Sequence, residues 1–79
     1  MSPVVFRYKG YRFFFFSREE ERIHIHVYSD DGEAKFWIEP EISLARNYGL
    51  SAKALNSIQK IIEERQDEIR DHWTKHFGS

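Results

Sequence analysis

The sequence predicts an α+β fold in which a four-stranded antiparallel sheet of two hairpins carries one long C-terminal helix on one face. Two stretches of β-branched and aromatic residues, each interrupted by a turn sequence that contains glycine, predict the hairpins. In the last third of the chain, apolar residues recur at three- and four-residue spacing, which predicts an amphipathic helix. We expect a single domain over residues 1–79, with the sheet at 3–39, a connector at 40–50 and the helix at 51–77.

The first hairpin is expected before residue 17, with its turn at Lys9-Gly10. Glycine readily adopts the positive φ that a tight hairpin turn requires. Because side chains on a strand alternate between the two faces, a two-residue turn here collects six apolar side chains on one face. The expected cross-strand pairs are Tyr8 with Tyr11, Phe6 with Phe13, and Val4 with Phe15.

The second hairpin is expected from Arg22 to Glu39, with its turn at Asp31-Gly32, a pair that favours tight turns. That register puts apolar side chains together on one face and polar ones on the other. The expected apolar pairs are Val27 with Phe36 and Ile25 with Ile38. The expected pairs on the polar face are Tyr28 with Lys35, His26 with Trp37, and His24 with Glu39.

The connector and the helix follow Pro40, which cannot donate a backbone hydrogen bond to a neighbouring strand. We expect residues 41–50 to form an irregular connector or a short helical turn. Ser51 is placed to cap the helix and Gly78 to end it. The apolar positions that define the helix, whose spacing is interrupted at Arg65, are Leu55, Ile58, Ile62, Ile69 and Trp73.

The expected helix is longer than the sheet beneath it. About 27 helical residues extend roughly 40 Å, whereas four strands side by side span about 19 Å. The outer end of the helix carries Ile69, Trp73 and Phe77, and we expect this end to need a partner surface, either a second copy of the chain or a small protein. The alternative is that the connector folds back under this end.

Composition restricts the classes of function. Hydrophobic residues at 41% and aromatic residues at 16% favour a folded domain, and the formal net charge of −1 provides no overall attraction to nucleic acid or to an anionic membrane. The absence of cysteine excludes disulfides, thiolate metal sites and cysteine nucleophiles. With no signal or membrane-spanning segment recognisable, the expected location is the cytoplasm.

The polar face of the sheet carries the residues best suited to chemistry. His24 and His26 are two residues apart on one strand, so both side chains point the same way. As an acid and a base, with Lys35 stabilising phosphate charge, they suit metal-independent cleavage of RNA. Cations on this face can hold phosphates, and its rings can stack on unpaired bases. The residues expected to bind nucleic acid are Arg7, Arg12, Arg22, Tyr28 and Trp37.

A plainer interpretation and a metal site compete with this one. The sheet histidines are also acceptable as ordinary polar residues on a solvated face. A zinc site usually takes three protein ligands, and Glu39 is the only obvious third ligand for the histidine pair. His72 and His76, one helical turn apart, have no third ligand. We therefore expect no metal and no cofactor.

Five segments occur in order along nearly the whole chain: GYRFFFFS, HIHV, GEAKFWIEP, NYGLS and a terminal HW..HFG. In combination they resemble a small prokaryotic family of domains of unknown function, numbered 4160, for which no chemistry is established. The resemblance implies a component of a toxin–antitoxin-like operon with a small protein partner. The family commonly has an acid-His-x-Pro-Pro segment before its His-x-His-Val block, where this chain has SREEERIHIH.

Two hypotheses of function follow. The first is a protein–protein interaction module, a homodimer or the partner-bound component of a toxin–antitoxin-like pair, which associates through Ile69, Trp73 and Phe77. The second is an RNA-binding protein or metal-independent ribonuclease that acts through the polar face of the sheet, with His24, His26 and Lys35 as catalytic residues.

Overall fold

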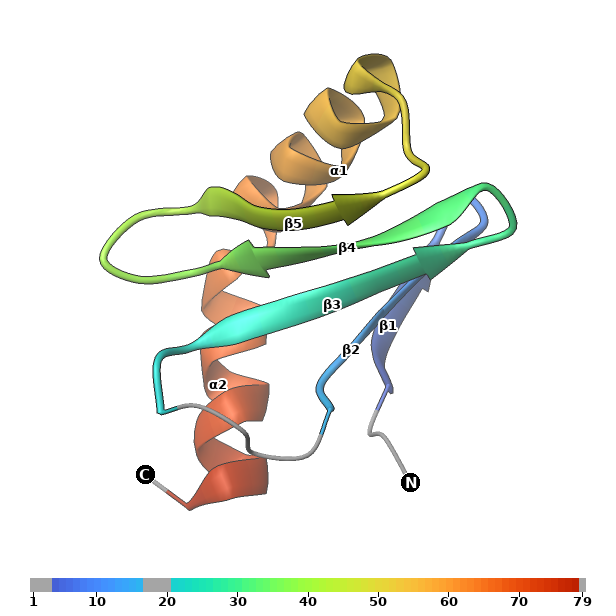
Figure 1. The fold of residues 1–79 in the computed structure, drawn as a ribbon. Coiled ribbons are helices and arrows are strands. Elements are labelled where there is room, and N and C mark those ends of the chain that lie inside the picture. Colours follow the sequence, from blue (N-terminus) through green and yellow to red (C-terminus); the bar gives the residue numbers. More distant parts are fainter. Residues whose placement is uncertain (1–3, 17–20, 79) are drawn as a thin grey trace.

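The computed structural model describes residues 4–16 and 21–78, which form a five-stranded antiparallel sheet with two helices packed on one of its faces (Figure 1). The α+β class is therefore confirmed, but the sheet has one strand more than expected and the helix is divided. The strands lie side by side in chain order: β1 (Val4–Tyr8), β2 (Tyr11–Phe14), β3 (His24–Ser29), β4 (Gly32–Trp37) and β5 (Ser43–Tyr48). The helices are α1 (Ala52–Glu64) and α2 (Gln66–Phe77).

The first hairpin has the expected turn. Lys9 and Gly10 both have positive φ, at 51° and 81°, and the pairs Tyr8–Tyr11 and Phe6–Phe13 are as expected. The third expected pair is wrong, because an irregularity between Val4 and Phe6 shifts the register, so that Val4 lies opposite Phe14. Phe15 is released from the ladder and is buried against Trp73 of α2, with ring centroids 5.2 Å apart.

The second hairpin turns one residue earlier than expected, so its register is shifted by two residues. Ser29 lies opposite Gly32, and the turn is therefore Asp30-Asp31. A side chain is excluded at Gly32, because a Cβ there would overlap the backbone oxygen of Tyr48. A shift by an even number of residues leaves every side chain on its expected face. The observed pairs are His24 with Trp37, Ile25 with Phe36, His26 with Lys35, Val27 with Ala34, and Tyr28 with Glu33.

The expected connector is wrong in one respect, because it contains β5, which pairs with β4 along the edge of the sheet. At the end of β5, the side chain of Asn47 closes the turn into α1. Its Nδ2 donates to the Leu50 carbonyl at 3.0 Å, and its Oδ1 accepts from the Leu50 amide at 3.1 Å. Gly49 has a φ of 90°, and a side chain there would crowd the Asp31 carbonyl, so this turn and the β3–β4 turn lie close together.

The prediction of a single long helix is also wrong, because the helix breaks at Arg65, which has φ −115° and ψ 20°. The Arg65 guanidinium carbon lies 4.4 Å from the centre of the Phe6 ring, so the break is packed against the first hairpin. The expected ends are confirmed. The Ser51 hydroxyl accepts from the Ala54 amide at 3.1 Å, and Gly78, with φ 79°, ends α2.

The core lies between the sheet and the helices. It contains the buried residues Phe13, Ile25 and Phe36 of the sheet, and Ile69 and Trp73 of α2. The change of direction at Arg65 lays α2 across the back of the sheet (Figure 1). Ile69 and Trp73, which we expected to need a partner surface, are therefore buried within the described part of the chain. Phe77 is partly buried against the same core.

The opposite face of the sheet carries no helix, and we call it the open face. Its side chains come from alternate positions of the five strands, as the register requires. Over residues 4–16 and 21–78, neither helix is both long and apolar enough to cross a membrane.

Candidate functional site

Four side chains form one row across the open face, which we call the central row. Phe14 of β2 lies opposite His26 of β3, His26 opposite Lys35 of β4, and Lys35 opposite Arg46 of β5. Neighbouring strands are about 4.8 Å apart, so each of these side chains is adjacent to the next. The register of four strands therefore places an aromatic ring, an imidazole and two cations in line.

A second row lies beside the first, toward the Lys9-Gly10 turn, and we call it the outer row. Its members are opposite one another in the same way, and it spans all five strands. The outer row is Arg7, Arg12, Tyr28, Glu33 and Tyr48. Successive rows are two residues apart along each strand, which is roughly 6.7 Å.

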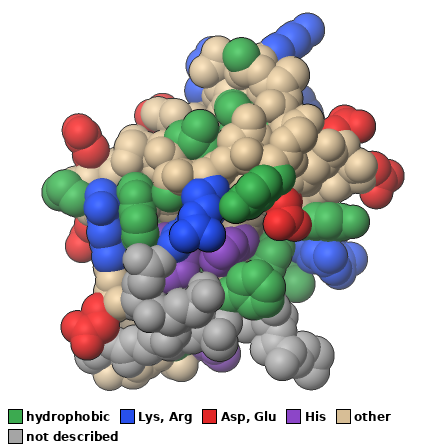
Figure 2. Space-filling view, in the orientation of Figure 1, with side chains coloured by type: hydrophobic (Ala, Val, Ile, Leu, Met, Phe, Trp, Pro, Cys, Tyr) green, Lys and Arg blue, Asp and Glu red, His purple; other side chains and the backbone are tan. Residues whose placement is uncertain are grey.

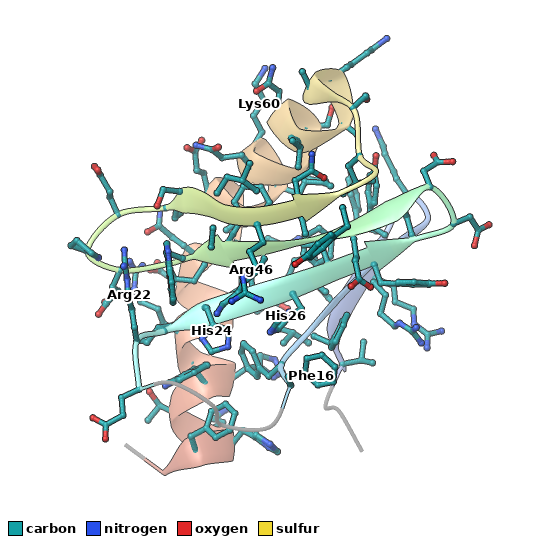
Figure 3. The ribbon with its side chains drawn as sticks, in the orientation of Figure 1. Phe16, Arg22, His24, His26, Arg46 and Lys60 are labelled. Atoms are coloured by element: carbon teal, nitrogen blue, oxygen red, sulfur yellow. The ribbon has the colours of Figure 1, made fainter. Side chains whose placement is uncertain are left out.

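The two rows enclose a hollow of about 380 Å³ over β3, β4 and β5. Beside members of the central row, Phe16, Glu33 and Tyr48 line it. Figure 2 shows histidine and basic side chains in the middle of the open face, with hydrophobic and acidic side chains around them. In Figure 3, the Arg46 side chain extends from β5 over the sheet toward His26. This hollow is the candidate site.

The charge in the hollow is unevenly arranged. Lys35 and Arg46 stand directly opposite each other, and like charges in that position destabilise a sheet. Lys35 is only 7% exposed, and its ammonium lies 4.5 Å from the centre of the Trp37 ring. Within the described residues, no ion pair joins Arg46 to a carboxylate. The register therefore places two cationic side chains next to each other in the lining of the hollow.

The two histidines of HIHV have different environments. His24 is 1% exposed, and its Nδ1 donates to the Arg22 carbonyl at 2.8 Å. The rings of Trp37 and Trp73 stand edge-on to its imidazole, with centroids 5.9 Å and 5.3 Å away. His24 therefore packs the sheet against α2 and does not line the hollow. The His24 ring lies 5.2 Å from the His26 ring, but of this expected catalytic pair only His26 lines the hollow.

His26 is the imidazole that faces the hollow. Its ring is stacked on Phe14, with centroids 5.6 Å apart, and stands edge-on to Phe16 at 5.0 Å. Lys35, the third residue with an expected catalytic role, lies directly opposite it. An imidazole beside two cations is suited to donate to a phosphate oxygen or to move a proton next to one.

The residues expected to bind nucleic acid lie on the open face, at two ends of it. Arg12 and Tyr28 are neighbours in the outer row, with the guanidinium carbon 5.3 Å from the ring centre, and Arg7 lies opposite Arg12. At the other end, the Arg22 guanidinium lies 4.1 Å from the centre of the Trp37 ring. The hollow lies between these two cation–ring pairs.

The candidate metal ligands are not brought together. The register shift places His24 opposite Trp37 instead of Glu39, and the Glu39 carboxylate pairs with Arg70 at 3.2 Å. Over the described ranges, no three His, Cys, Asp or Glu side chains are grouped closely enough to hold a metal ion. Residues 17–20 of the SREEER segment lie outside the described residues.

Sequence reasoning missed the contributions of Arg46 and Tyr48, because it treated their segment as a connector. The signal present was the alternation of Leu44, Arg46 and Tyr48 with smaller or polar residues after Pro40, a period of two. Glu33 was missed as well, because its cross-strand partner Tyr48 lies on β5, the strand that was not expected.

Comparison with known proteins adds one finding. A family model described as "Domain of unknown function (DUF4160)" matches residues 10–74, which include β2 to β5, α1 and most of α2. No curated protein and no solved structure matches the chain.

Proposed function

Since the chain belongs to the DUF4160 family, whose description assigns no activity, we propose from its own residues that the open face binds single-stranded nucleic acid, with RNA as the expected ligand. The phosphates are held by the central row, and the bases stack on the rings beside it. This is the second of the two hypotheses drawn from the sequence, with the binding residues revised.

The observation that carries the proposal is the placement of Lys35 opposite Arg46 in the hollow. Two cations at directly opposed positions of a sheet repel each other, and a phosphate between them can accept a charge-assisted hydrogen bond from each. Arg7 and Arg12 form a second pair of the same kind on the same face. Two such pairs, on a chain with a formal net charge of −1, make the open face locally basic.

The aromatic residues favour single strands over duplexes. Phe16 and Tyr48 line the hollow and are 48% and 58% exposed, so their rings are accessible to a ligand. Base stacking on such rings requires bases that are not already stacked and paired within a helix. Stacking of this kind is tolerant of sequence, whereas the phosphate contacts are sensitive to salt.

The test is the binding of a fluorescently labelled single-stranded RNA of mixed sequence, followed by fluorescence anisotropy. Arg46→Ala removes one of the two opposed cations from an exposed side chain, and we expect it to weaken binding about tenfold, the effect of losing one hydrogen bond to a charged group. The matched control is Lys60→Ala, because Lys60 lies on α1, away from the hollow (Figure 3). We expect this control to bind as the wild type does.

The salt dependence distinguishes phosphate binding from stacking. Each phosphate contact to a single strand contributes about −0.7 to the slope of log K against log salt, so Arg46→Ala is expected to reduce the slope by about that amount. Equal loss of affinity in the Arg46 and Lys60 variants, or no binding by the wild type in low salt, would contradict the proposal.

A metal-independent ribonuclease is the catalytic form of the same proposal. It is supported by the adjacency of His26 and Lys35 in the hollow, and it now rests on the one imidazole that lines the hollow. The test is cleavage of labelled RNA in the presence of EDTA by the wild type and by His26→Ala. Cleavage that persists in the variant would rule out His26 as the acid or base.

A second candidate keeps the interaction module, either as a homodimer or as the partner of a small operon-encoded protein of toxin–antitoxin type. It is now supported by β5 alone, an edge strand with Leu44 and Tyr48 exposed, and not by the end of the helix. Light scattering tests self-association directly, because it measures the mass of the particle in solution and one chain has a mass of 9.6 kDa. A dimer that Leu44→Lys dissociates would support this candidate, and a monomer at all concentrations would contradict the homodimer.

A further inference from the structure

We propose that the end of the hollow formed by Glu33 and Tyr48 selects guanine, so that the open face reads one base as well as holding phosphates. This inference rests on the proposed binding of nucleic acid and names the ligand chemistry within it.

Glu33 and Tyr48 are directly opposite each other on β4 and β5, and both line the hollow. Directly opposed side chains on a sheet have Cβ atoms about 5 Å apart, so the two side chains are neighbours. The Tyr48 ring is 58% exposed, which leaves a face for a base. A base stacked there presents its edge to the Glu33 carboxylate.

The carboxylate is at odds with a surface that binds only phosphate, because it repels the phosphate that Lys35 and Arg46 attract. Within the described residues, Glu33 forms no ion pair with Arg46, its diagonal neighbour. An ionised carboxylate is purely a hydrogen-bond acceptor, so its partner in the ligand must be a donor. Glu33 therefore indicates a ligand that carries N–H groups close to its phosphate.

Among the four RNA bases, guanine meets this requirement best. Its N1–H and its N2 amino group point the same way and can donate to both carboxylate oxygens at once, as in a bidentate charge-assisted pair. Cytosine offers its N4 amino group alone, next to the acceptor N3, and adenine likewise pairs one amino group with the acceptor N1. Uracil offers one N–H between two carbonyl oxygens, which the carboxylate repels.

The spacing of the rows fits one nucleotide. Glu33 and Tyr48 belong to the outer row, while Lys35 and Arg46 belong to the central row, roughly 6.7 Å away along the strands. In a nucleotide the base and the phosphate are joined through a single sugar. A guanine on Tyr48 therefore places its own phosphate beside Lys35 and Arg46.

The experiment measures the anisotropy of four labelled RNA pentamers that are identical except for a central G, A, C or U. We expect the wild type to bind the G oligomer about tenfold more tightly than the U oligomer, the discrimination typical of one bidentate contact to a base. Glu33→Gln, which has one acceptor instead of two and carries no charge, is expected to reduce that ratio to below about threefold. The matched control Glu64→Gln alters an exposed acid on α1 and leaves the ratio unchanged.

Tyr48→Leu separates stacking from base reading. It removes the ring, so it is expected to weaken the binding of all four oligomers, whereas Glu33→Gln weakens the binding of the G oligomer selectively. Guanosine and uridine monophosphates, used as competitors, distinguish a free nucleotide from RNA as the source of the guanine. A preference for the guanosine monophosphate that Glu33→Gln abolishes would support the site with a free nucleotide as its ligand.

Two results would overturn the inference, and they are distinguishable. Equal binding of the four oligomers, or a preference for G that survives Glu33→Gln, refutes base reading and leaves nucleic-acid binding standing. No binding of any oligomer or nucleotide by the folded wild type refutes the proposed function and the guanine site together.

Discussion

The imidazole of His24 stands edge-on to the indole of Trp73, with ring centroids 5.3 Å apart, and this contact joins the first residue of β3 to the middle of α2. The same indole packs against Phe15, at 5.2 Å between ring centroids. Trp73 therefore connects α2 to two segments that precede it by about 50 residues or more in the sequence.

Trp73→Ala is expected to lower the free energy of unfolding by about 3–5 kcal/mol, the usual effect of removing a large buried aromatic side chain. Small domains are stable by only about 5–15 kcal/mol, so the variant is expected to unfold at much lower urea concentrations. Urea denaturation followed by circular dichroism measures the change. Thr74→Ala is the control, because Thr74 is the exposed neighbour on the same helix. Similar unfolding midpoints for the two variants would contradict the packing role of Trp73.

The two histidines are expected to separate stability from binding. His24→Leu removes the hydrogen bond to the Arg22 carbonyl and leaves that acceptor without its partner, so it should cost about 1–3 kcal/mol of stability. Because His24 does not line the hollow, the fraction that remains folded should bind RNA with unchanged affinity.

His26→Ala is expected to behave in the opposite way. It removes the imidazole that faces the hollow, so it should weaken RNA binding about tenfold, the effect of one hydrogen bond to a phosphate. Urea denaturation and anisotropy on both histidine variants provide the comparison. A loss of affinity in His24→Leu as large as in His26→Ala would show that both rings contribute to the site.

Gly32→Ala is expected to affect stability and binding together. A Cβ at Gly32 would overlap the Tyr48 carbonyl oxygen, so the end of β5 must move, and Tyr48 moves with it. Gly10→Ala is the matched control: its φ of 81° strains an alanine, but nothing lies near the added Cβ and the hollow is elsewhere. We expect both variants to be less stable, by about 1–2 kcal/mol for Gly10→Ala. Only Gly32→Ala should weaken RNA binding.

Ser51→Ala is expected to destabilise the chain by about 1 kcal/mol, because the Ser51 hydroxyl accepts from the Ala54 amide at the start of α1. Ser57→Ala, at an exposed position inside the same helix, is expected to be neutral or slightly stabilising, since alanine is the better helix former. Thermal unfolding of the two variants checks the difference. A midpoint for Ser51→Ala equal to that of the wild type would mean that the cap contributes nothing in solution.

Local patterns were enough to predict most of the sheet. The turn at Lys9-Gly10 was confirmed, and both residues have positive φ. A glycine-containing pair has a strong local preference for such a turn. The second hairpin was predicted with the wrong turn, yet Ile25 and Phe36 still share the core face and His26 and Lys35 still share the other. An error of two residues in register does not change which face each side chain is predicted to occupy, because side chains on a strand alternate with a period of two.

The site was predicted less completely than the sheet. His26, Lys35, Arg12 and Tyr28 were recognised from their residue types on a polar face, and the structure places them on the open face. Arg46 was not recognised, because an alternation with a period of two over only six residues is too short a signal to distinguish an edge strand from a connector.

The sequence by itself determined which side chains share a face, where the first hairpin turns, and where the helical region begins and ends. These features depend on alternation, on positive φ at glycine and on a capping hydroxyl, all of which act between residues close together in the chain. The tertiary structure alone decided the pairing of β5 with β4, the break at Arg65 and the burial of His24. Each of these depends on a partner distant in the sequence: the unpaired edge of β4, the Phe6 ring, and the indole of Trp73. The hollow that joins Arg46 to His26 arises only when those distant partners meet.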